Sequence, residues 1–120
     1  MNQIGEKIEF EKCYCRDMNF DELLYVLKRN ISIYWSWGAH RIIVDKMRKD
    51  GYIKMFRFTV SGHHHKGHVY IFLNGLDLFD VYLTTNQGTI KQRTDEMGIY
   101  NDQLVEWIDE RVERIPEYAR

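Results

Sequence analysis

Histidine side chains are concentrated in one short segment, where four of the five in the chain fall within six residues. In an extended backbone His63 and His65 point to the same side, and a turn after them would bring His68 alongside. Cys13 and Cys15 repeat this two-residue spacing. Two thiolates and two imidazoles satisfy a tetrahedral zinc site, so these five residues are the candidate metal ligands. The spacing matches no recognised zinc-finger pattern, and it favours the competing interpretation, a solvated polar loop without a metal.

The two cysteines are also candidate nucleophiles. Cys13 or Cys15, with His63 or His68 and Asp80, supplies the residue types of a cysteine-based triad. Neither thiol lies in a glycine-rich turn or before the start of a helix, the features that activate a cysteine. The chain has no glycine motif for phosphates or dinucleotides. We therefore expect no catalytic residue and no resident cofactor, with zinc as the alternative.

Charge is unevenly distributed along the 120 residues. Seventeen basic and eighteen acidic side chains give a net charge of −1, without the basic excess of a dedicated nucleic-acid binder. Residues 1–60 carry a net charge of +3, whereas residues 61–120 carry −4. Basic and acidic residues are thus in excess in different halves of the chain.

The acidic surplus lies mainly in residues 95–117, which hold eight carboxylates and two arginines. Such a run is usually the solvated face of a helix. The functional alternative is a surface for a basic partner protein. The carboxylates that would form it are Glu106, Asp109, Glu110 and Glu113.

Basic residues surround the turn predicted at Asp50-Gly51, and with tyrosines on neighbouring segments they suggest a basic, aromatic sheet surface. Such surfaces stack single-stranded bases in other sheet-based modules. Aromatic side chains in strands more often serve packing, so nucleic-acid binding is the weaker alternative. The basic residues are Lys46, Arg48, Lys49, Lys54 and Arg57, and the tyrosines are Tyr34, Tyr52 and Tyr70.

Helical signals lie near both ends of the chain. Asn19 and Glu22 have the spacing of a capping box, and apolar residues then recur at helical intervals, which predicts a helix over residues 20–29. Asn101 is the candidate N-cap of a second helix. Its apolar stripe runs from residue 104 to residue 115 and ends before the single proline.

Between the helices, apolar residues alternate with a period of two, as expected of strands with one buried face. The pattern predicts a strand over residues 31–37, with Trp35 and Trp37 both in the core. It predicts further strands over residues 40–45 and 56–60. A short helix through residues 43–47, ending at Gly51, is the alternative for the segment after residue 40.

A β-hairpin is predicted around Asn74-Gly75. These two residues separate the apolar segments 69–73 and 76–83, and both tolerate the positive φ that a type I′ turn requires. A further turn at residues 86–88 leads to a short edge strand over residues 89–92.

These elements predict one α+β domain over residues 1–120, with a helix, a mostly antiparallel sheet of four to six strands, and a second helix. Two amphipathic helices would cover one sheet face and leave the other partly exposed. Residues 1–18 would form an N-terminal segment, and residues 116–120 a tail.

The start of the chain lacks the pattern of a secretory signal. The longest apolar run of the chain, residues 69–73, is too short to span a bilayer. We therefore expect a soluble cytoplasmic protein with free thiols.

Four stretches, residues 35–38, 62–73, 74–75 and 77–82, give the chain a resemblance to small uncharacterised proteins of bacterial mobile elements, including conjugative transposons of gut Bacteroidetes. The resemblance covers roughly residues 19–112 and implies no activity, cofactor or catalytic residue. It implies an accessory or regulatory protein rather than a housekeeping enzyme. We expect a non-enzymatic module that binds a partner protein, or a second copy of itself, through the exposed sheet face or the acidic helix.

Overall fold

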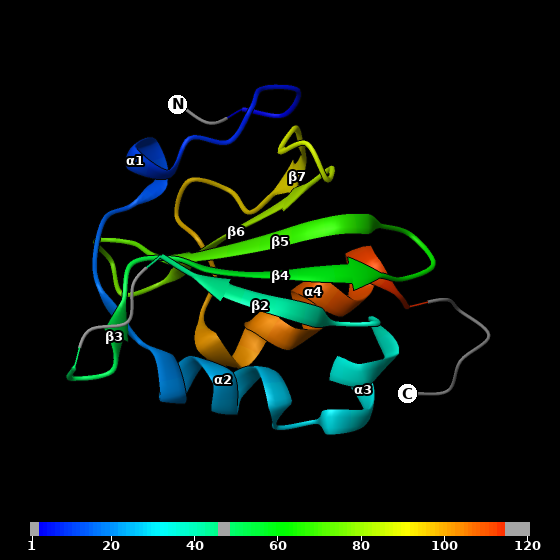
Figure 1. Ribbon diagram of the computed structural model, residues 1–120, viewed down its shortest axis with the longest axis horizontal. Coiled ribbons are helices and arrows are strands. Elements are labelled where there is room, and N and C mark those ends of the chain that lie inside the picture. The colour runs from blue at the N-terminus through cyan, green and yellow to red at the C-terminus, as the bar shows by residue number, and fades with distance from the viewer. Residues whose placement is uncertain (1–2, 46–48, 115–120) are drawn as a thin grey trace.

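A five-stranded antiparallel sheet forms the centre of the structure, a computed structural model that describes residues 3–45 and 49–114 (Figure 1). A separate pair of two-residue strands, β1 (Met18–Asn19) and β3 (Tyr52–Ile53), is also antiparallel. The strands of the main sheet, in spatial order, are β2 (His40–Val44), β4 (Phe56–Ser61), β5 (Lys66–Leu73), β6 (Phe79–Thr84) and β7 (Ile90–Arg93).

The longer helices lie on one side of this sheet, and the N-terminal segment lies on the other (Figure 1). The first side holds α2 (Phe20–Lys28), α3 (Ile31–Ser36) and α4 (Leu104–Val112). The second side holds α1 (Phe10–Cys13). The predicted α+β class with a central antiparallel sheet is therefore confirmed. None of the helices in the described ranges is both long and apolar enough to cross a membrane.

The helix predicted over residues 20–29 is confirmed, and its cap forms as expected. The Asn19 side chain accepts a hydrogen bond from the Glu22 amide at 2.9 Å. The C-terminal helix differs at its start, because a 3-10 turn (Asn101–Gln103) precedes α4 and Tyr100, rather than Asn101, holds the N-cap position. The helix ends at Val112, and residues 115–120, with the predicted tail, lie outside the described residues.

The strand predicted over residues 31–37 is wrong, because this segment folds as α3. Asn30 accepts a hydrogen bond from the Ile33 amide at 3.3 Å and caps the helix, which ends before Gly38 at a φ of +64°. Only one of the two tryptophans is in the core. Trp37 is fully buried, whereas Trp35 is 69% exposed.

The strand predicted after residue 40 is confirmed as β2, so the helix alternative is wrong for residues 43 and 44. The rest of that alternative includes residues 46–48, which lie outside the described residues. β2 carries a bulge, because the pairing register with β4 shifts between His40 and Ile43. Arg41 has a φ of +55° at this point.

The predicted hairpin forms between β5 and β6, but its connection is longer than a two-residue turn. The Asn74 side chain accepts hydrogen bonds from the amides of Leu76, at 2.8 Å, and Leu78, at 3.2 Å. The positive φ falls on Asp77, at +61°, and not on Gly75. The second strand consequently begins at Phe79. The short edge strand is confirmed as β7.

The sheet separates two hydrophobic cores. The larger lies under α2, α3 and α4 and includes Trp37, Phe56 and Phe58. The smaller lies under the N-terminal segment and is built from Cys13, Phe72, Tyr82 and Ile90. Backbone hydrogen bonds from the amides at positions 5 and 16 join the N-terminal segment to β7 and β5, and the amide at position 8 donates to Gly88 in the turn before β7. The second face is therefore covered in part, as the sequence predicted.

Candidate functional site on the open sheet face

The predicted histidine ligands point to different neighbours. His63 Nδ1 lies 2.5 Å from Glu113 Oε2, and its amide donates to the same carboxylate. His68 Nδ1 lies 3.1 Å from the Thr59 hydroxyl. His65 is buried, and this burial lowers its pKa, so it is neutral near physiological pH. The segment is thus partly a structural contact rather than the solvated loop that the sequence favoured.

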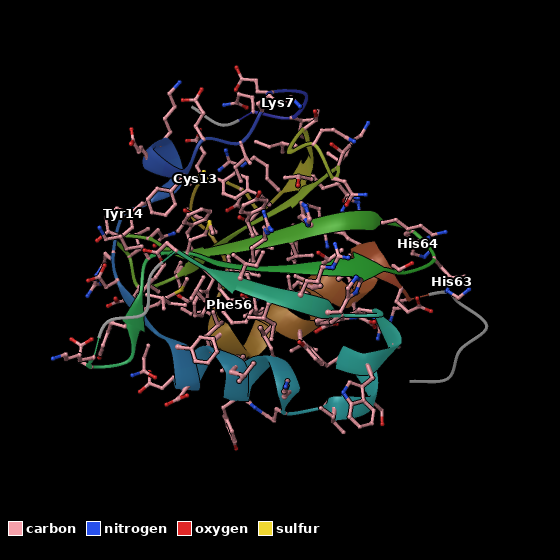
Figure 2. All side chains as sticks on the ribbon, viewed as in Figure 1. Lys7, Cys13, Tyr14, Phe56, His63 and His64 are labelled. Carbon is pink, nitrogen blue, oxygen red and sulfur yellow. The ribbon has the colours of Figure 1, made fainter. Side chains whose placement is uncertain are left out.

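The two cysteines are not close to these histidines. Figure 2 shows Cys13 at the end of α1, whereas His63 and the adjacent His64 lie at the tip of the β4–β5 hairpin, on the other side of the molecule. Cys15 is exposed. Within residues 3–45 and 49–114, no three His, Cys, Asp or Glu side chains are arranged to hold a metal ion. The zinc alternative therefore has no ligand set in this part of the chain.

Burial raises the pKa of the Cys13 thiol to about 11. The side chain is 6% exposed and packs in the smaller core with Phe72 and Tyr82. A catalytic cysteine needs the opposite shift, because the thiolate is the nucleophile. Cys13 is therefore a structural, unreactive thiol.

We expect the two thiols to react with Ellman's reagent at very different rates near neutral pH. A pKa of about 11, against a usual value of 9.0, reduces the thiolate fraction of Cys13 about 100-fold, and burial excludes the reagent. One equivalent should react fast, and the second should react much more slowly until denaturant is added. Cys15→Ser should abolish the fast phase and Cys13→Ser should preserve it. Equal rates in the native protein would contradict this assignment.

The predicted acidic surface on α4 is divided between inner and outer residues. Asp109 is 2% exposed and accepts a hydrogen bond from Trp37 Nε1 at 3.0 Å. Glu113 is 6% exposed and receives the contacts from His63. Both carboxylates hold the fold together. They are not available to a partner.

The outer carboxylates of α4 have a basic neighbour in the chain. Arg114 Nη1 lies 4.0 Å from Glu106 Oε1 and 3.5 Å from Glu110 Oε1. Arg111 Nη1 lies 3.6 Å from the other carboxylate oxygen of Glu110. This helix face therefore carries little uncompensated negative charge, and a basic partner would have to displace two arginines.

The predicted basic patch is likewise dispersed. Lys46 and Arg48 lie outside the described residues, and Lys49 is exposed. Lys54 Nζ lies 5.3 Å from the centre of the Tyr14 ring, at one end of the sheet. Arg57 belongs to β4 and lies on the main sheet. The patch as predicted is therefore not one surface.

The associated tyrosines are also separated. Tyr34 is 4% exposed in the helix-side core, and Tyr52 is 38% exposed on β3. Tyr70 is half-buried on β5, where it pairs directly with Arg57 on β4. Of the predicted basic and aromatic residues, Arg57 and Tyr70 are therefore the pair that the main sheet brings together.

Around this pair, the sheet face opposite the helices stays open. In an antiparallel sheet, directly paired residues present their side chains to the same face, so the pairings of β2, β4 and β5 define the surface. Ile43 pairs with Arg57, Arg57 with Tyr70, and Thr59 with His68. We call this the open sheet face. Its members are Ile43, Arg57, Thr59, Ser61, Lys66, His68 and Tyr70.

Side chains of the open sheet face contact one another. Arg57 Cζ lies 5.9 Å from the centre of the Tyr70 ring, and the His68 ring meets Tyr70 edge to face at 6.3 Å. Burial, followed by the charge of Arg57, lowers the pKa of His68, and the charge of Arg41 acts in the same direction. His68 is therefore a neutral polar group, and the arginines supply the positive charge.

The electrostatic balance of this surface follows from three adjacent strands. β2, β4 and β5 together contain Arg41, Arg57 and Lys66 but no aspartate or glutamate. Arg57 Nε is buried and has no hydrogen-bond partner in the described structure. The sequence contains the same residues, but only the strand register shows that Arg57 and Lys66 share one face, whereas Arg41 lies in the bulge of β2.

Comparison with known proteins finds no relative of this chain. A scan against protein-family models finds no match, and no curated protein or solved structure is significantly similar to this chain. The functional argument therefore depends on the residues and contacts of the chain itself.

Proposed function

We propose that this protein is a non-enzymatic binding module that holds an acidic, extended segment of a partner protein on the open sheet face and along β2. One observation carries the proposal. The open sheet face carries Arg57 and Lys66, and β2, β4 and β5 contain no carboxylate; the charge of Arg41 on β2 also acts on His68 of this face. A surface of one charge sign attracts and orients a partner of the other sign.

The edge of the sheet supports an extended partner. β2 is the terminal strand, so its outer row of backbone N–H and C=O groups has no strand neighbour among residues 3–45 and 49–114. Four of its five residues are exposed, including Ile42 at 37% and Ile43 at 42%. An extended peptide adds to such an edge by backbone hydrogen bonds, while alternate side chains contact the sheet. Acidic side chains of the peptide would meet the arginines.

The same surface is less suited to single-stranded nucleic acid. Proteins that bind single strands stack successive bases on several exposed aromatic rings. On β4 and β5 of the open sheet face, Tyr70 is half-exposed, and the next aromatic residue along β5, Phe72, is fully buried in the smaller core. Arg57 and His68 already contact the Tyr70 ring. The Tyr70 ring alone, already in contact with two side chains, therefore cannot stack several successive bases.

The test is a titration with a synthetic peptide of alternating valine and glutamate, followed by amide chemical shifts. We expect shifts at β2 and at Arg57 and His68, and none on α4. The double substitution Arg41→Glu and Lys66→Glu should weaken binding at least about tenfold, since it removes two charge-assisted contacts of about 1 kcal/mol each. Lys28→Glu with Arg29→Glu, two exposed positions on and just after α2, is the matched control and should leave affinity unchanged.

Three results would overturn the proposal. The first is an equal response to a valine–lysine peptide, which would mean that charge does not select the ligand. The second is tighter binding of oligothymidylate on the same residues, which would assign the face to nucleic acid. The third is concentration-dependent self-association that the double substitution abolishes, because a second copy of the chain would then occupy the edge.

A further inference from the structure

A cleft of about 450 Å³ lies at the end of the sheet, away from the open sheet face. Its walls come from β1, the first turns of α2, the β5–β6 connection and the segment before α4. The floor is apolar, since Met18 and Leu23 are each 3% exposed and Leu73 and Phe79 pack against the same core. The cleft therefore offers a ligand apolar contacts as well as polar ones.

Two tyrosines stand at the mouth of the cleft. Tyr52 is 38% exposed and Tyr100 is 62% exposed, and both line the cavity. Large aromatic side chains so exposed lose hydrophobic stabilisation unless something covers them. An aromatic ring offers a cation a negative face in addition to apolar contact. The pair thus suits a ligand that is both apolar and positively charged.

Carboxylates complete the mouth of the cleft. Asp77 is paired with Arg16 Nη1, and Asp17 accepts a hydrogen bond from the Tyr14 hydroxyl at 2.7 Å. The Glu22 carboxylate also lines the cleft, on the first turn of α2. Of these carboxylates, Asp77 is compensated by Arg16, whereas Glu22 has no ion pair among the described residues and is the carboxylate that a cation could approach. The three carboxylates do not form a cluster that could hold a metal ion, so an inorganic cation is not the fitting ligand.

We propose that this cleft binds an organic cation, an alkylammonium or guanidinium group on an aliphatic chain. The chain would lie on Met18 and Leu73, and the head group would contact Glu22 and the faces of Tyr52 and Tyr100. Each part of the ligand thus meets a surface of matching character. The same chemistry occurs in a free amine and in the lysine or arginine side chain of a polypeptide.

The experiment compares three probes by amide chemical shifts at Asn19, Leu23 and Asn101. They are acetyl-lysine-methylamide with a free side-chain ammonium, the norleucine analogue that lacks the ammonium, and n-butylammonium chloride at matched ionic strength. We expect saturable shifts with the lysine compound at millimolar concentrations and none with the norleucine compound. Equal saturation by butylammonium would identify a free amine as sufficient, whereas a response to the lysine compound alone would identify a polypeptide side chain.

Substitutions separate recognition from folding. Glu22→Gln and Tyr100→Ala should each weaken binding of the lysine compound about five- to tenfold, while Tyr100→Phe should retain it. Glu110→Gln, which alters an exposed carboxylate on α4, is the matched control and should change nothing. Equal shifts from the norleucine compound, no shifts from any probe, or unchanged affinity in Glu22→Gln would overturn the proposal. These results are independent of the peptide titration on the open sheet face.

Discussion

Trp37→Ala should lower the free energy of unfolding by about 4 kcal/mol, the usual cost of removing a buried large aromatic side chain. Trp37 is fully buried, and its ring stacks on Phe58 with centres 6.1 Å apart. Its Nε1 donates to Asp109, which is itself buried, so the substitution also leaves a carboxylate without one of its donors. Urea denaturation followed by far-ultraviolet circular dichroism measures the change.

Trp35 provides the matched control. It lies two residues earlier in the chain but is 69% exposed, so Trp35→Ala should change the free energy of unfolding by no more than about 0.5 kcal/mol. Trp37→Phe separates the two contributions of Trp37, because it keeps most of the ring and removes the donor to Asp109; we expect a loss of about 2 kcal/mol. Similar losses from both alanine substitutions would show that α3 does not place these residues as described.

Gly62→Ala should destabilise the protein by about 3 kcal/mol, because the new methyl group has no room. A Cβ at this position would lie 2.3 Å from the carbonyl oxygen of Val112 and 2.8 Å from its carbonyl carbon. The same oxygen accepts a hydrogen bond from the His64 amide at 2.8 Å. The hairpin and α4 cannot separate without losing this bond and the contact between His63 and Glu113.

Gly75→Ala is the corresponding control. A Cβ there would meet only Cys15 Sγ, at 3.6 Å, which is ordinary contact. The φ of Gly75 is not in the left-handed region, so alanine restricts the unfolded chain without strain and should leave stability equal or up to about 1 kcal/mol higher. Thermal unfolding of both variants tests the pair. A Gly62→Ala protein as stable as the parent would show that α4 does not pack against the hairpin at this point.

The regular part of the sheet could be predicted because its buried and exposed positions follow the alternation of apolar and polar residues in the sequence. In β4, Phe56, Phe58 and Val60 are buried while Arg57 and Thr59 are only partly so. This period of two has no helical counterpart, and turns with strong local preferences bound it on both sides. The same holds for α2, where the Asn19 cap and the apolar spacing agree.

The prediction for residues 31–37 was wrong because their apolar residues fit the period of a strand as well as that of a helix. The sequence Ile-Ser-Ile-Tyr-Trp-Ser-Trp alternates polar and apolar positions, yet its buried members, Tyr34 and Trp37, are three apart. An interval of three residues suits a helix, and the cap from Asn30 stabilises the helix further relative to a strand. The exposure of Trp35 could not be predicted, because nothing in a single sequence distinguishes an exposed tryptophan from a buried one.

The candidate sites depended on tertiary placement even more than the fold did. Asp109 and Glu113 look like surface charges on a helix, but long-range contacts with Trp37 and His63 bury them. Conversely, Arg57 and Tyr70 are thirteen residues apart and meet only through the β4–β5 register. Sequence supplied the residue types. The distribution of charge between the two sheet faces required the structure.

The division of the interior into two cores has a consequence for native-state fluctuations. Of the residues that the structure describes, the helix-side core contains sixteen buried side chains and the core under the N-terminal segment contains four. Local opening costs least where the fewest apolar contacts are lost, so residues 3–16 should detach while the rest of the domain remains folded. Amide hydrogen exchange would therefore be fastest across this segment. Each opening would lay bare Phe72, Tyr82 and Ile90 and extend the exposed part of the sheet from β4 and β5 across β6 to β7.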